Sequence, residues 1–441
     1  MISRRMAGWP TCVLVLVVAA GSSAVQAADV GYHVSVGLGY SDNIARLPED
    51  EESETIGSLG LDFSILQRSR KLDLQATADL SWLKYFGDTY DSELVGTFTG
   101  EGTYEIVSEH LAWVAQDNFG QVRIDPFSAL TPDNLENINY FTTGPDLTFG
   151  MGKDTRLRLS GRFSDIAYEE SPFDSTRLSG IARLMHAFSS ATTVSLNAQR
   201  DHIDFDEAPD DLDYDRDQAF LRYEATGSRT QLAVDLGYSR LLQGDETTDG
   251  LMMRLEASRN VSASSTVLLT AGREFLDAGD SFRLEQGLPS GGLEARPSTQ
   301  TPNPFTSTYA SLGWQFHRNR TGLTFDVTHF DDAYETASAL DRTRMLASLG
   351  LTREITPAMR LYLGGTYAQE DFDTAIGDYH ETGGMLGLTH RLGRNLTVGA
   401  RYNHLRRKGD VPVGAISENR FWLSLSYGRD APQAALAPRI Q

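Results

Sequence analysis

The chain has 441 residues, with 60 acidic against 39 basic side chains, and its formal net charge is −21. Such an excess of negative charge argues against a nucleic-acid partner, because affinity for a phosphate backbone depends on lysine and arginine. The mean hydropathy is −0.32, and no apolar run is long enough for a membrane-spanning helix. The chain is too long for a single soluble core of ordinary size, so its apolar surface must be buried in another way.

Residues 1–27 have the features of a signal peptide, with Arg4 and Arg5 before an apolar segment and a small-residue cleavage site that ends at Ala27. Cys12, the only cysteine, falls within this segment. The mature chain is therefore expected to form no disulfide and to hold no thiolate metal site.

The segment 71–86 sets the pattern for the rest of the chain. Successive side chains of a strand point to opposite faces, so this segment predicts a strand with one apolar and one polar face. Its length suits a tilted strand that crosses a bilayer. The apolar set is Leu72, Leu74, Ala76, Ala78, Leu80 and Trp82, and it alternates with Asp73, Gln75, Thr77, Asp79 and Ser81.

The same unit recurs to residue 427 and predicts an all-β fold, a transmembrane antiparallel up-and-down β-barrel of about 20 strands, with 18 as the alternative. Residues 28–427 form the barrel, and 428–441 are expected to be a periplasmic C-terminal tail. Connections alternate in length, which indicates short periplasmic turns and long, acidic extracellular loops. The short connections include 152–154, 227–229, 318–320 and 393–394, and the long ones 42–54, 119–136, 204–217, 277–304 and 407–417.

Aromatic residues of the apolar stripes fall at both ends of the predicted strands, as expected for rings that prefer the two membrane interfaces. We therefore expect the protein in the outer membrane of a Gram-negative bacterium, in contact with lipid and lipopolysaccharide. The predicted outer band holds Tyr40, Trp82, Tyr238, Tyr367 and Tyr402, and the inner band Tyr104, Phe188, Phe316 and Tyr427.

The polar faces would line a lumen roughly 40 Å across, which either water or inward-folded loops must occupy. We consider two roles for its bases: they offset lumen carboxylates, or they form a cationic strip that guides an anionic saccharide. Arg158 should lie nearly opposite Arg183, with Asp146 as a candidate partner. The predicted lumen bases are Arg156, Arg158, Arg162, Arg177 and Arg183, and the acids Asp62, Asp73, Asp79, Glu101, Asp235, Glu256 and Asp326.

One region resembles a known family. It comprises Asp125-Pro126, 130–134 (LTPDN), 137–141 (NINYF) and 144–147 (GPDL), supported by 41–43 (SDN) and 113–118 (WVAQDN). These motifs are similar to those of β-barrel porins encoded with bacterial exopolysaccharide clusters, including clusters of the PEP-CTERM sorting system. The resemblance implies a role in exopolysaccharide export, with the polymer and periplasmic export proteins as partners.

Two other functions stay open at this stage. A general diffusion porin would suit the mixed charge of the lumen, and no ladder of sugar-stacking aromatic residues is evident on the predicted inner face. A structural barrel would follow if the segment 277–304 folded inward and plugged the lumen. An enzyme is not expected, because the nine histidines are scattered and no serine-hydrolase motif occurs. No catalytic residue, metal site or cofactor is predicted.

Overall fold

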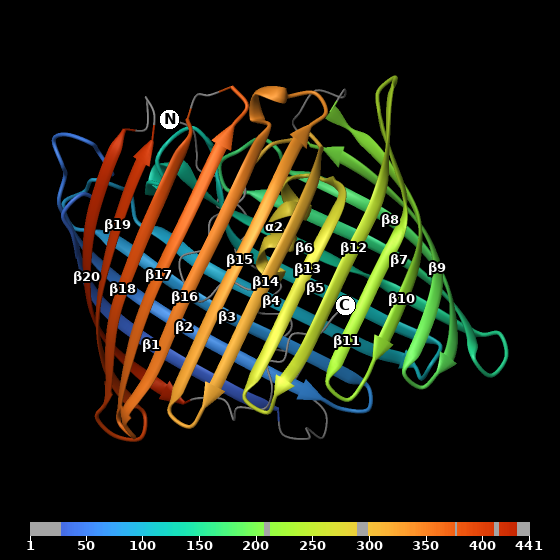
Figure 1. Cartoon of the computed structure of the whole chain (residues 1–441), viewed down its shortest axis with the longest axis horizontal. Helices are drawn as coiled ribbons and strands as arrows, with labels where there is room; N and C mark the ends of the chain where they lie inside the picture. Colours follow the sequence, from blue (N-terminus) through green and yellow to red (C-terminus); the bar gives the residue numbers. More distant parts are fainter. Residues whose placement is uncertain (1–27, 207–211, 289–298, 375–376, 410–413, 430–441) are drawn as a thin grey trace.

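The computed structural model describes residues 28–206, 212–288, 299–374, 377–409 and 414–429. The predicted signal peptide, and the predicted tail beyond Arg429, lie outside these residues. The described chain forms one closed antiparallel barrel of 20 strands (Figure 1). The strands are β1 (Asp29–Ser41), β2 (Glu54–Arg68), β3 (Leu72–Tyr85), β4 (Glu93–Val107), β5 (Leu111–Arg123), β6 (Leu135–Gly150), β7 (Thr155–Tyr168), β8 (Ser175–Ser189), β9 (Thr192–Phe205), β10 (Tyr214–Thr226), β11 (Thr230–Gln243), β12 (Glu246–Ser262), β13 (Ser265–Leu276), β14 (Phe305–Arg318), β15 (Thr321–Tyr334), β16 (Arg342–Thr356), β17 (Met359–Phe372), β18 (Tyr379–Arg391), β19 (Leu396–Gly409) and β20 (Ala415–Arg429).

Each strand pairs with its sequence neighbours, and β1 pairs with β20, where Val36 faces Leu425. This closure satisfies the edges of the sheet and confirms the count of 20 over the alternative of 18. Even-numbered strands are followed by short turns and odd-numbered strands by longer loops, as predicted, except that only residues 244–245 separate β11 from β12. The turn end is therefore taken as periplasmic and the loop end as extracellular.

The outer wall is apolar and exposed in the isolated chain. Phe188, Leu423 and Leu196 are 68%, 64% and 60% exposed, a fraction that no soluble protein core would leave uncovered over a whole belt. Tyr40 and Trp82 near the loop end, and Tyr104 and Tyr427 near the turn end, are also exposed. Lipid is the solvent that such a belt requires, so this is a membrane-spanning barrel of the outer-membrane type. Among the described residues, no helix has the length and apolarity needed to cross a membrane.

The lumen receives the long connection between β13 and β14. Its helix α2 (Ala278–Gly287) lies inside the barrel rather than above it (Figure 1). Two short 3-10 helices, η1 (Pro132–Asn134) and η3 (Ser338–Leu340), belong to other loops. The sequence-based alternative that 277–304 folds inward is thus confirmed for the described part of this segment.

The assignment of the two wall faces makes a prediction for β2. Leu61→Arg would place a charge on the lipid face, where Leu61 is 43% exposed, and should lower the free energy of unfolding in lipid vesicles by about 2–4 kcal/mol. Ser64→Arg, three positions along the same strand and on the lumen face, is the control and should cost little. Urea unfolding of both variants tests this, and equal losses would contradict the assigned faces.

Candidate functional site

Helix α2 begins at a side-chain cap. Asp277 has extended backbone geometry, and its Oδ1 accepts a hydrogen bond of 2.7 Å from the amide of Asp280. An aspartate at this position satisfies a free amide of the first turn and suits the positive end of the helix dipole. The helix therefore starts with two carboxylates close together.

Two buried arginines of the barrel wall hold those carboxylates. Arg177 on β8 donates to Asp277 and, at 2.8 Å, to Asp280. Arg216 on β10 donates to the other oxygen of Asp280 at 2.8 Å and to Asp201 on β9 at 2.9 Å. Arg177, Arg216, Asp277 and Asp280 are called the N-terminal clasp below. Since its charges are buried, each is stable only while its partners stay in place.

An apolar contact follows one turn later. Phe282 is 4% exposed and packs against a cluster on β5, β6 and β7 that includes Val122, Ile138 and Tyr140. Gly120 on β5 makes room for it, because a Cβ atom there would lie 2.9 Å from the Phe282 ring and 3.1 Å from Gln286. This wall therefore carries a seat shaped for the helix.

The other end of α2 meets the opposite part of the wall. Glu285 accepts a hydrogen bond of 2.8 Å from Arg344 on β16, and Arg344 also pairs with Asp332 on β15 at 3.0 Å. Glu285, Arg344 and Asp332 are called the C-terminal clasp. Because β16 is six strands from β10, α2 bridges two separate regions of the wall and obstructs the lumen between them.

The returning chain is fastened to the same network. Thr299 accepts a hydrogen bond of 2.7 Å from Arg342, and the amide of Gln300 donates to the carbonyl of Arg123 at 2.9 Å. Arg123 and Arg342 both pair with Glu370, at 3.0 and 2.8 Å. The inward loop is thus held by charged and polar groups at its start, its middle and its return.

The two ends of α2 respond to protons in opposite directions. Burial acts to raise the pKa of Asp280, but Arg177, Arg216 and Arg283 outweigh it, and the net pKa lies well below its ordinary value. Burial raises the pKa of Glu285 in spite of Arg344. The carboxylate of Asp280 therefore stabilises the docked helix at pH values above its ordinary pKa, and this stabilisation is lost in acid. Protonation of Glu285 has the opposite effect and favours the docked state.

The predicted bases all lie on the lumen face but have different partners. Arg177 belongs to the N-terminal clasp. Arg158 does lie directly opposite Arg183, as predicted, but Asp146 is not their partner: it pairs with Arg162 at 2.5 Å. Arg183 instead donates to Asn197 at 2.7 Å, and Arg156 is exposed to the lumen nearer the periplasmic end. Arg162 and Arg177 therefore pair with carboxylates, whereas Arg183 binds an amide oxygen.

The predicted acids also share the lumen face. Asp62 lies directly across from Asp79 on β3, and Asp73 forms a long, exposed pair with Arg68 at 3.9 Å. Glu101 lies opposite Gln75.

Asp235, Glu256 and Asp326 lie farther around the wall. Asp235 is buried between Arg222 and Arg254, at 3.2 and 3.8 Å. Glu256 lies opposite Ala233, and Asp326 accepts a hydrogen bond from Ser348. Asp235, Arg222, Arg254 and Glu274 thus form a charge network on β10–β13.

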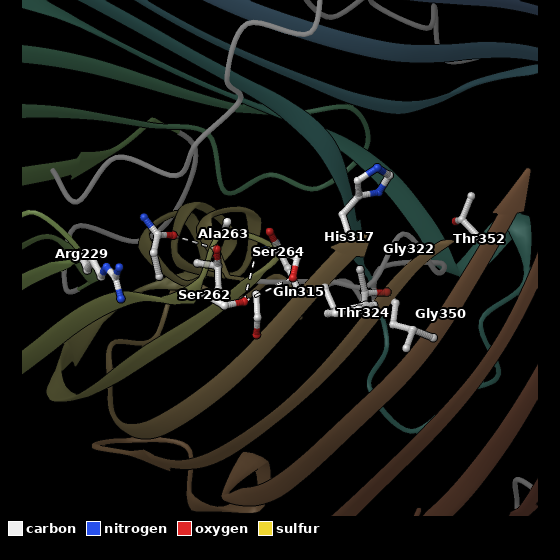
Figure 2. A pocket seen from close by; sticks show the side chains of 15 residues that line it. Arg229, Ser262, Ala263, Ser264, Gln315, His317, Gly322, Thr324, Gly350 and Thr352 are labelled. Atoms are coloured by element: carbon white, nitrogen blue, oxygen red, sulfur yellow. Dashed lines mark hydrogen bonds between the residues drawn. The ribbon is translucent and has the colours of Figure 1, made fainter. Parts of the chain in front are cut away.

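A polar recess of about 680 Å³ opens at the periplasmic end of β12–β16. Figure 2 shows Gln315, His317 and Thr352 around it, with Gly322 and Gly350 leaving its floor free of bulky groups. Hydroxyl and amide side chains make up about half of its lining and lie beside Phe316 and Leu323, so it suits a solute with both hydrogen-bonding groups and apolar faces.

Several functional side chains were not singled out from the sequence. Arg216 and Arg344 are ordinary members of a polar stripe, and nothing in the sequence pairs them with Asp280 and Glu285 across the lumen. The sequence showed no ladder of sugar-stacking aromatic residues, but the structure places two aromatic rings, Tyr362 and Trp422, on the inner face. The only available signal was their position between the apolar residues of each stripe.

No family model matches the sequence, and no curated protein matches it. Among solved structures, a point mutant of the ferric enterobactin receptor PfeA of Pseudomonas aeruginosa is similar over 92% of this chain and 81% of its own, with 10% identity and a TM-score of 0.48. A loop-deletion mutant of OmpT of Vibrio cholerae covers 91% and 100%, with 13% identity and a TM-score of 0.34. OccK2 of P. aeruginosa, in complex with glucuronate, covers 92% and 100%, with 10% identity and a TM-score of 0.37. This likeness is at the level of the barrel.

The wall and its inward helix define the class of the protein. It is an outer-membrane β-barrel with a polar lumen that is obstructed by a docked loop helix. Its resemblance to receptors and porins goes no further than this architecture.

Removing the N-terminal clasp should release α2. In Arg177→Gln/Arg216→Gln, Asp277 and Asp280 lose their cationic partners, and docking should weaken by roughly 3–5 kcal/mol, the usual cost of breaking a buried ion pair. Hydrogen exchange of residues 278–287 should then approach that of a solvent-exposed segment. Arg156→Gln, an exposed lumen arginine, is the control. Unchanged protection in the double variant would show that the clasp does not hold the helix.

Acid should loosen the same contact through Asp280. A nitroxide label on Gly287→Cys, in protein without residues 1–27, should be immobile at neutral pH and become mobile as the pH falls below 3.8, the ordinary pKa of Asp280. In Asp280→Asn the label should already be mobile at pH 7, and the acid step should disappear. Asp154→Asn, in a periplasmic turn, should keep the normal profile. An unchanged acid step in Asp280→Asn would contradict the assignment.

Proposed function

We propose that this barrel is a gated outer-membrane channel through which an exopolysaccharide leaves the cell, with α2 as the gate. The observation that carries the proposal is the manner in which α2 is held. Its two ends dock through the N-terminal and C-terminal clasps, and between them Phe282 and Leu284 pack against apolar clusters of the wall. A helix whose two ends are held by ion pairs can leave its seat when water in the lumen solvates those charges.

The cargo is inferred from two features. The lumen wall below the helix is polar, and the recess at the periplasmic entrance is lined by hydroxyl and amide groups that suit a carbohydrate. The motifs between Phe119 and Phe149 resemble those of porins encoded with exopolysaccharide clusters, and in the structure they cover the part of β5 and β6 against which Phe282 packs. Lipopolysaccharide around the rim and periplasmic export proteins at the turn end are the partners this proposal implies.

Deletion of the gene tests the proposal in cells. The polymer should accumulate in the periplasm of the deletion strain, and a plasmid copy of the wild-type gene should restore it to the surface. Periplasmic and surface polysaccharide are measured separately after osmotic release. Normal surface polymer in the deletion strain, with growth and envelope integrity unchanged, would refute a role in export.

A general diffusion porin is the second candidate, favoured by the mixed charge of the lumen and the polar, open recess. A structural barrel is the third, favoured by the docked position of α2. The three differ in permeability. A diffusion porin passes small sugars in its resting form, a gated channel only after α2 has been released, and a structural barrel in neither state.

Liposome swelling separates these functions. Wild-type protein should give slow swelling in small neutral sugars, and Arg177→Gln/Arg216→Gln should raise the rate several-fold because α2 no longer obstructs the lumen. Arg156→Gln should behave as wild type. Rapid swelling with wild-type protein would favour the diffusion porin, and an equally slow rate with the double variant would favour the structural barrel.

A further inference from the structure

One row of directly opposite residues crosses the inner wall from β16 to β1. Residues that face each other across neighbouring strands point to the same side of the sheet, so every member of this row faces the lumen. The row consists of Thr352, Tyr362, Gly387, Arg401, Trp422 and Gly39. Two aromatic side chains, one arginine and two glycines therefore share a single line, with Arg401 and Trp422 next to each other.

Trp422 lies flat on its glycine neighbour. A Cβ atom at Gly39 would be 2.8 to 2.9 Å from three fused-ring atoms of the indole, Cδ2, Cε3 and Cε2. Cδ2 is a ring-fusion atom enclosed by its own bonds, so the glycine meets the face of the ring and not its edge. One indole face thus rests on the wall, and the side chain as a whole stays partly exposed.

Tyr362 also contacts a glycine, but less closely. A Cβ atom at Gly387 would be 3.4 Å from its Cβ and 3.6 Å from its Cδ2. Its hydroxyl oxygen accepts a hydrogen bond of 3.4 Å from Arg360, and its side chain is partly exposed. Both rings are therefore positioned along the wall instead of projecting across the lumen.

Arg401 stands between the two rings and is exposed. Within the described part of the chain, its guanidinium forms no ion pair, in contrast to the arginines of the two clasps. A lumen-facing cation with no carboxylate of the barrel beside it is available to an anionic solute.

The row rises through the barrel as it crosses the wall. Counted from the turn end of each strand, Tyr362 is the fourth residue, Arg401 the sixth, Trp422 the eighth and Gly39 the eleventh. Its lower end joins the recess, because Thr352 is part of the recess lining and lies directly opposite Gly322 and Tyr362. A solute in the recess (Figure 2) is therefore already beside the first ring.

We propose that this row is a binding site for an anionic oligosaccharide segment, a saccharide that bears carboxylate groups. The inference rests on the proposed function in that it names the class of polymer the channel would carry. The apolar C–H face of a sugar ring stacks on an aromatic face because the π cloud is negative. The guanidinium of Arg401 binds a carboxylate with two hydrogen bonds.

The spacing fits such a ligand. Tyr362 and Trp422 are three strands apart, which is about 14 Å along the wall, so a short oligosaccharide spans both rings and reaches Arg401 between them. The ascent of the row directs a chain from the periplasmic recess toward the loop end. A site of this kind holds each segment loosely and in several places, as passage requires.

A purely structural role for Trp422 is the alternative, because part of its side chain packs against the buried cluster of Ile44, Ile56 and Tyr85 near the loop end. That role predicts a loss of stability on substitution and no effect on sugar binding. Binding and stability are therefore measured on the same variants.

Calorimetric titration of the purified barrel with trigalacturonate and with maltotriose tests the site. The wild-type barrel should bind trigalacturonate more tightly than maltotriose. Arg401→Gln should weaken trigalacturonate about tenfold, the cost of one charge-assisted contact, and leave maltotriose unchanged. Trp422→Ala should weaken both sugars by about tenfold or more, and Trp422→Phe should restore most of the affinity. Heat-modifiable gel migration confirms that each variant is folded.

Two matched controls are available. Leu423→Ala changes the neighbouring residue on the lipid face, and Arg156→Gln removes an exposed lumen arginine on another wall. Both should bind as wild type. The proposal is overturned if neither sugar binds, if folded Trp422→Ala and Arg401→Gln bind as wild type, or if Arg156→Gln causes the same loss. If the sugars bind as expected but deletion of the gene leaves export normal, the binding site is retained and the export role is rejected.

Discussion

The structure depends on one constraint: in lipid, every backbone amide and carbonyl must find its partner within the protein. Twenty strands meet this constraint by closing β20 onto β1. Closure with so many strands makes the wall too wide for side chains to fill. The polar inner face, the inward loop and the charge networks are all consequences of that empty space, because a lumen of this width needs either water or a segment of chain.

The segment that enters the lumen is attached by buried ion pairs at both ends of α2 and by apolar contacts between them. A helix with a broad apolar face would need the inner wall to be apolar as well, and such a wall would be unsuitable for a hydrated solute. Phe282 and Leu284 supply the apolar contacts, and Gly120 leaves the space that accommodates Phe282. The ion pairs of the two clasps fix the position of α2 while both members of each pair are present. Loss of one member leaves a buried, unpaired charge, which favours release of α2 from the wall.

The obstruction and the proposed saccharide row lie on different parts of the same lumen. The N-terminal clasp and the Phe282 seat occupy β5–β10 and the C-terminal clasp the loop end of β15 and β16, whereas the row runs from the turn end of β16 to β1. Their arginines differ accordingly: those of the clasps are buried and paired, and Arg401 is exposed. One set of cations positions the gate, and another is available to the cargo.

The alternation of residues such as those of 72–82 determined the strands, the two wall faces and the alternating connections, because a period of two is a local property of the backbone. It also placed Arg158 opposite Arg183, since a hairpin register follows from its turn. Only the tertiary structure decided which charges meet. Arg177 reaches Asp277 and Asp280, and Arg344 reaches Glu285, over separations of about 60 to 100 residues. The paths of an inward loop and of ladder rows around a closed barrel depend on curvature and shear, which no local pattern records. For the same reason, the candidate partner Asp146 pairs with Arg162 instead of Arg158 or Arg183, and only closure of the barrel placed Gly39 beside Trp422.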